Sequence, residues 1–68
     1  MPQKHKVPGT TLYFSVTEDK RLFVADFFSQ DGVFIEDLAI PKDSTTLEEF
    51  IGYCNFIGRC IEAQKPRW

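Results

Sequence analysis

The sequence predicts an α+β fold in which a three-stranded antiparallel β-meander packs against one C-terminal α-helix. Three patterns lead to this prediction. Residues 10–17 alternate between apolar and polar side chains, as a half-buried strand does. In the stretch 23–40, Asp31-Gly32 separates two runs rich in Phe, Val and Ile, which is typical of a β-hairpin. In the last third of the chain, from Leu47 to Ile61, apolar side chains recur with a helical period. The predicted elements are strands at about 10–17, 21–29 and 33–40 and a helix at about 45–64.

The first strand has one apolar face, formed by Leu12, Phe14 and Val16. We expect a turn at Asp19-Lys20 that pairs Glu18 with Arg21. In that register, this face lies beside the apolar face of the second strand, formed by Phe23, Ala25 and Phe27. Both runs of the central hairpin are apolar on both faces, so the sheet needs cover on both sides.

The register of the central hairpin depends on the length of its loop, and the sequence leaves two alternatives. A two-residue loop at Asp31-Gly32 places Asp26 opposite Asp37. A three-residue loop with Gly32 in a bulge places Asp26 opposite Glu36 instead. In either register the hairpin brings these carboxylates together.

The helix is predicted to begin with a capping box, formed either by Thr45 with Glu48 or by Thr46 with Glu49. Both glutamates then lie at the positive end of the helix dipole. Gly58 falls within the apolar stripe, where we expect a close approach to the sheet; the alternative is a local kink. The stripe itself consists of Leu47, Phe50, Ile51, Cys54, Ile57 and Ile61.

The sequence divides into a single βββα domain at 10–64 and two short ends. Residues 1–9 are polar and contain two prolines, so we expect a flexible N-terminal tail. His5 has no Cys or His at ligand spacing, and we expect no metal site. The C-terminal tail, 65–68, ends on Trp68, which either covers the open sheet face or anchors a partner.

Charge and cysteine usage limit the classes of partner and compartment. The chain has 10 acidic and 8 basic residues, and the stretch 18–49 carries nine acids against three bases. This acidic middle argues against duplex nucleic acid as a partner. Cys54 and Cys60 point in different directions on one helix, so they are expected to be free thiols in a reducing compartment. With neither a signal peptide nor a membrane-length apolar run, a cytoplasmic protein is predicted.

Surplus apolar surface is the main functional signal in the sequence. One helix covers only one face of a sheet, and Tyr53 and Phe56 point away from the helical stripe. We therefore expect a small non-enzymatic protein-binding module without catalytic residues, metal or cofactor. The predicted partner-binding residues are Phe28, Tyr53, Phe56 and Trp68, with the acids Asp26, Glu36, Asp37, Glu48 and Glu49.

In size and charge, the chain resembles the small inhibitors that phages use against host defence systems, anti-CRISPR proteins among them. This resemblance implies a basic nucleic-acid-binding enzyme as the partner. It also implies that the acids act as phosphate mimics: Asp26, Asp31, Glu36, Asp37, Glu48 and Glu49.

Several alternatives stay open at this point. The acids serve only solubility, or the partner is a second copy in a homodimeric regulator. A βββα domain that binds nucleic acid, or an enzyme built on paired carboxylates, is less well supported, because the helix start is acidic and so short a meander offers little concave pocket.

Overall fold

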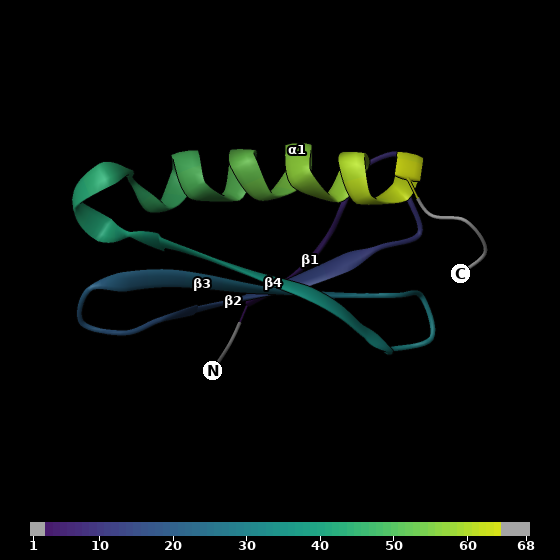
Figure 1. Ribbon diagram of the computed structural model, residues 1–68, viewed down its shortest axis with the longest axis horizontal. Coiled ribbons are helices and arrows are strands. Elements are labelled where there is room, and N and C mark those ends of the chain that lie inside the picture. The colour runs from purple at the N-terminus through teal and green to yellow at the C-terminus, as the bar shows by residue number, and fades with distance from the viewer. Residues whose placement is uncertain (1–2, 65–68) are drawn as a thin grey trace.

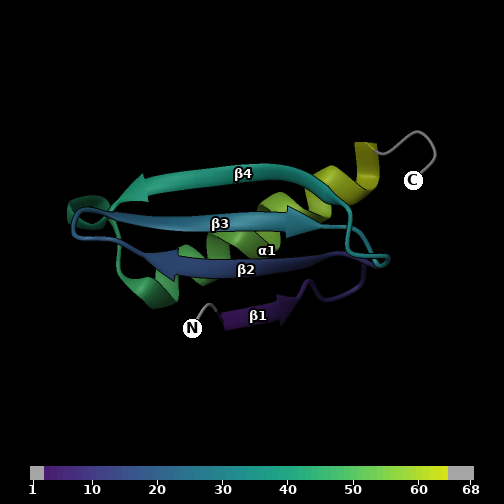
Figure 2. The ribbon, with the colours of Figure 1, turned by 90° about the horizontal axis from the view of Figure 1, so that it is seen from below.

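The computed structural model describes residues 3–64 and has the predicted α+β architecture, with one strand more than expected. Its elements are β1 (Gln3–Lys6), β2 (Tyr13–Glu18), β3 (Leu22–Phe28), β4 (Phe34–Pro41), the 3-10 turn η1 (Lys42–Ser44) and α1 (Leu47–Gln64). The four strands form one antiparallel sheet in the order β1-β2-β3-β4 (Figure 2). The helix lies along one face of this sheet, so the fold has two layers (Figure 1).

The additional strand corrects the prediction of a flexible tail over residues 1–9. Residues 3–6 pair with β2, and Val7 directly after them is fully buried. The connection to β2 is a compact turn, in which Gly9 takes a φ of +77°. The Thr10 hydroxyl donates to the Val7 carbonyl and accepts from the Leu12 amide, at 2.8 and 3.0 Å. The Pro-Gly pair therefore turns the chain between two strands and does not belong to a flexible tail.

The turn between β2 and β3 lies one residue later than expected. Glu18 pairs with Phe23 and not with Arg21. The reason is Asp19, whose carboxylate accepts hydrogen bonds from the backbone amides of Arg21 and Leu22, both at 2.8 Å. These two bonds also hold the pKa of Asp19 below its ordinary value. Because the register changes by two residues, every side chain stays on its predicted face.

The loop between β3 and β4 has three residues, which was the second of the two alternatives. The Ser29 amide donates to the Val33 carbonyl at 2.8 Å, and Gly32 takes a φ of +85°. The Ser29 hydroxyl also accepts from the Val33 amide at 3.1 Å. Only glycine takes such a φ readily, which explains the Asp-Gly signal.

A β-bulge at Ile35 nevertheless restores the pairing expected for the shorter loop. The partners along the two strands are Phe28 with Phe34, Phe27 with Glu36, and Asp26 with Asp37. Ile35 is the extra residue, and its side chain packs against the core. Two aspartates therefore face each other on adjacent strands, in the arrangement that repulsion disfavours.

The hydrophobic core lies between α1 and the sheet face below it. Its buried side chains are Val7, Leu12, Phe14, Val16, Phe23, Ala25, Phe27, Phe50 and Cys54. The predicted helical stripe is confirmed, since its other members are half-buried against this core. The capping box is the one formed by Thr46 and Glu49: the Glu49 amide donates to the Thr46 hydroxyl at 3.1 Å, and the Thr46 amide to the Glu49 carboxylate at 3.0 Å.

Gly58 is where the helix comes closest to the rest of the chain. A Cβ at this position would lie 2.6 Å from a methyl carbon of Val7, whose side chain is fully buried. The predicted close approach is therefore correct, but the contact is made by the residue that follows β1. Gly52, six residues earlier on the same helix, has no atom within 4 Å of such a Cβ.

We predict that Gly58→Ala lowers the free energy of unfolding by about 1–2 kcal/mol, because overpacking against Val7 outweighs the better helix propensity of alanine. The matched control Gly52→Ala should raise that free energy by about 0.5–1 kcal/mol. Urea unfolding followed by circular dichroism measures both changes. Equal stabilisation by the two substitutions would contradict the close contact.

Candidate functional site

The face of the sheet opposite α1, called the outer face from here on, has no second layer among residues 3–64. Figure 2 looks onto this face, with the helix behind the strands. No element among residues 3–64 packs over it, and Figure 1 shows both layers from the side. Cross-strand partners project from the same face, so the register tells which side chains it carries.

The register sorts the side chains of the outer face into three rows that run across the strands. The charged row consists of Lys4, Ser15, Asp26 and Asp37. The aromatic row consists of Lys6, Tyr13, Phe28 and Phe34. The aliphatic row consists of Thr17, Val24 and Ala39. Leu22 and Pro41 continue the face beyond the aliphatic row.

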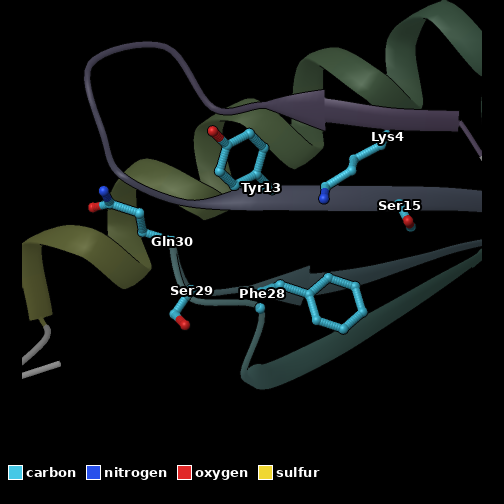
Figure 3. A pocket seen from close by; sticks show the side chains of 7 residues that line it. Lys4, Tyr13, Ser15, Phe28, Ser29 and Gln30 are labelled. Carbon is cyan, nitrogen blue, oxygen red and sulfur yellow. The ribbon is translucent and has the colours of Figure 1, made fainter.

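The aromatic row presents rings to solvent. Phe28 and Phe34 meet edge to face, with ring centroids 6.0 Å apart, and 54% of Phe34 is exposed. Beside them is a shallow hollow of about 280 Å³ (Figure 3). Its lining residues are Lys4, Tyr13, Ser15, Phe28, Ser29, Gln30 and Gly32. Contiguous exposed apolar surface of this kind marks interaction sites in soluble proteins.

The positive and negative side chains of the charged row lie at opposite ends of the row. Asp26 and Asp37 are direct neighbours on β3 and β4, whereas Lys4 lies on β1 at the far side of the row. The Lys4 ammonium lies over the ring of Tyr13, 5.1 Å from its centroid. Adjacent strands are about 4.8 Å apart, so two strand spacings separate Lys4 from the nearer aspartate. Within residues 3–64, neither aspartate forms an ion pair.

The structure divides the predicted partner-binding residues among separate surfaces. Phe28, Asp26 and Asp37 share the outer face. Tyr53 and Phe56 lie on α1, in the other layer, where their rings stack 6.4 Å apart and are 43% and 53% exposed.

The remaining predicted residues are not on the outer face. Glu36 is the partner of Phe27 and so belongs to the face of the sheet that α1 covers, although its own side chain is exposed. Glu48 and Glu49 lie in the first turn of α1, where Glu49 also takes part in the capping box. Trp68 lies outside the residues that the structure describes.

Three contributors to the outer face were missed in the sequence. Lys4 and Lys6 belong to β1, a strand whose sequence shows no apolar alternation. Phe34 lies on the predicted third strand, but its face depends on the length of the loop before it, which the sequence left open. The three-residue loop alone places Phe34 opposite Phe28 and therefore on the outer face; nothing in the local sequence indicates β1.

The side chains that carry chemistry elsewhere in the fold do not assemble into a reactive site. Among residues 3–64, no group of three or more His, Cys, Asp or Glu side chains is placed to hold a metal ion. His5 stacks on Phe14, with ring centroids 4.9 Å apart. Burial raises the pKa of the Cys54 thiol to about 12, which leaves it protonated at neutral pH. No helix in the described part of the chain is long and apolar enough to span a membrane.

Comparison of the chain with protein-family models, with curated proteins and with solved structures finds no significant match.

We predict that one of the two thiols, Cys60, reacts with Ellman's reagent in the native protein at pH 8, because Cys54 is fully buried and its raised pKa suppresses the thiolate. Both should react in urea. The same shift makes the fold less stable as the pH rises from the ordinary pKa of a thiol toward 12, since the unfolded chain loses that proton first. Rapid reaction of two thiols in the native state would contradict the burial of Cys54.

We predict that Asp37→Asn raises the free energy of unfolding by about 0.2–1 kcal/mol, because it removes the repulsion between cross-strand carboxylates. The measurement is urea unfolding of dilute protein at low ionic strength. In 1 M salt the difference from the wild type should shrink, since exposed charges are then screened. A lower stability of the variant at low salt would show that Asp37 has a favourable partner.

Proposed function

We propose that the protein is a non-enzymatic protein-binding module that binds its partner through the outer face. The observation that carries this proposal is the uncovered sheet face with the exposed ring of Phe34 and the half-buried ring of Phe28 beside it. Burying such surface against another protein is the ordinary way to remove it from water. The absence of a reactive cluster among residues 3–64 is consistent with a binding role but does not carry the argument.

The outer face supports this function better than the exposed rings on the helix do. Tyr53 and Phe56 form a single pair on a convex helix. The outer face instead offers a flat, hydrogen-bonded platform with rings, aliphatic side chains and a hollow next to one another. Interfaces owe most of their affinity to a few aromatic anchors in a desolvated centre, and Tyr13 and Phe28 occupy the two central strands of the sheet.

The phage-inhibitor prediction involves fewer acids when the outer face is taken as the binding surface. Of the six acids considered as phosphate mimics, only Asp26 and Asp37 share the outer face. Mimicry of a nucleic acid by this module would therefore use these two carboxylates flanked by rings. Binding of nucleic acid itself is disfavoured, because these carboxylates occupy the middle of the face.

We predict that the double substitution Phe28→Ser/Phe34→Ser abolishes protein binding while the fold is retained, since both side chains are at least partly exposed in the isolated subunit. The matched control is Tyr53→Ser/Phe56→Ser, which removes two exposed aromatic rings from the helix and should leave binding intact. The immobilised protein is exposed to cell extract and to an isotope-labelled copy of itself, and retained chains are identified by mass spectrometry. Circular dichroism verifies the fold of each variant.

The opposite pattern, with binding lost only in the helix variant, would overturn the proposed function. So would binding that survives both double substitutions.

A further inference from the structure

We infer that the partner of the outer face is a second copy of this chain, packed face to face about a two-fold axis that runs parallel to the strands. This inference rests on the proposed function, because it takes the outer face to be the binding surface. It adds the identity of the partner and the way in which the two copies are placed.

The symmetry follows from the order of the strands. A two-fold axis between β2 and β3, parallel to both, places β1 of the second copy over β4 and β2 of the second copy over β3. Positions along the strands do not change under this rotation. Each of the three rows therefore lies over the same row of the second copy, with its ends exchanged, apart from the small rotation between packed sheets.

The charged row is complementary to itself under this operation. Lys4 of the second copy comes over Asp37, and the symmetry repeats the pair at the other end of the row. Packed sheets lie about 10 Å apart, a gap that a lysine and an aspartate side chain span together. Both charges, which have no ion-pair partner in the described part of the subunit, then gain one.

Charge also selects the axis. A two-fold axis perpendicular to the strands would place β4 over β4 and β1 over β1. Asp37 would then face Asp37, and Lys4 would face Lys4, which is unfavourable at both edges. A uniformly basic partner would meet Asp26 and Asp37 favourably but would repel Lys4. A second copy presents both signs in the required order.

The aromatic row gains the most from this packing. Tyr13 of the second copy lies over Phe28, and the same contact recurs across the axis, so these rings form the centre of the interface. Phe34 of the second copy, on β4, comes over Lys6 of β1, beside the hollow that Lys4 and Tyr13 line (Figure 3). An exposed ring on one copy is thus placed next to a hollow on the other.

The size of the outer face sets the expected affinity. The molecule measures 36 × 21 × 16 Å, and Figure 1, a view down the shortest axis, shows the two layers stacked along the intermediate one. The outer face therefore spans about 36 × 16 Å along the backbone, roughly 580 Å² in projection, which makes it a small interface beside the roughly 800 Å² of accessible surface that each partner of a standard interface buries. We expect a reversible dimer with a dissociation constant in the micromolar range.

The test is sedimentation velocity of the purified protein over a concentration series, with charge-swap variants. The wild type should pass from monomer to dimer. Lys4→Glu and Asp37→Lys should each weaken the dimer at least tenfold, because each places like charges at both ends of the charged row. The double variant Lys4→Glu/Asp37→Lys should regain most of the affinity, since the pair is restored with its signs reversed. Lys20→Glu, in the exposed turn after β2, changes the net charge as Lys4→Glu does and should have no effect.

Three outcomes would overturn the inference. A wild type that stays monomeric to millimolar concentration excludes the second copy; the proposed function survives this result if Phe28→Ser/Phe34→Ser still abolishes the capture of another protein. A dimer that ignores both charge swaps is not packed about the inferred axis. A dimer lost only in Tyr53→Ser/Phe56→Ser uses the helix and would overturn the proposed function as well. Unfolding curves for each variant separate loss of association from loss of fold.

Discussion

One helix covers only one face of a four-stranded sheet, and the rest of this structure depends on that constraint. The covered face holds the entire buried core, from Val7 to Cys54. The outer face has the same strands but no second layer among residues 3–64, although it carries Tyr13, Val24 and Phe28. Apolar residues on an uncovered face cost solubility, and the proposed binding partner would bury them.

The bulge at Ile35 determines which charged side chains of β4 lie on the outer face. The three-residue loop alone would have placed Asp26 opposite Glu36 and turned Asp37 toward the helix side. The bulge absorbs one residue, so Asp37 joins the charged row while Ile35 reaches the core. Because β4 is an edge strand, the bulge, the neighbouring acids and Pro41 also make that edge a poor template for further strand pairing. The proposed dimer associates across the face, and these features disfavour association along the edge.

Most of the fold could be predicted from the sequence, but only part of the outer face could. Strand alternation, the Asp31-Gly32 turn, the helical stripe and the Thr46–Glu49 cap are local signals, and all of them are found in the structure. No local signal indicates β1. Gln3–Lys6 has no strand pattern of its own, and it pairs with β2 next to the buried side chain of Val7. The bulge likewise has no signature in the residues that flank it. Since Lys4 reaches the outer face only through β1, and Phe34 and Asp37 share that face only because of the bulge, the self-complementary rows could not be recognised from the sequence.

The most direct measurement is NMR of side chains on dilution, which reports the interface residue by residue. If the outer face is buried by association, the Val24 methyl groups and the Phe28 ring shift between concentrated and dilute samples, while the Phe56 ring on the helix does not. Shifts confined to Phe56 and Tyr53, or spectra that do not change over the whole concentration range, would contradict the claim that the uncovered sheet face is where this protein binds a second copy.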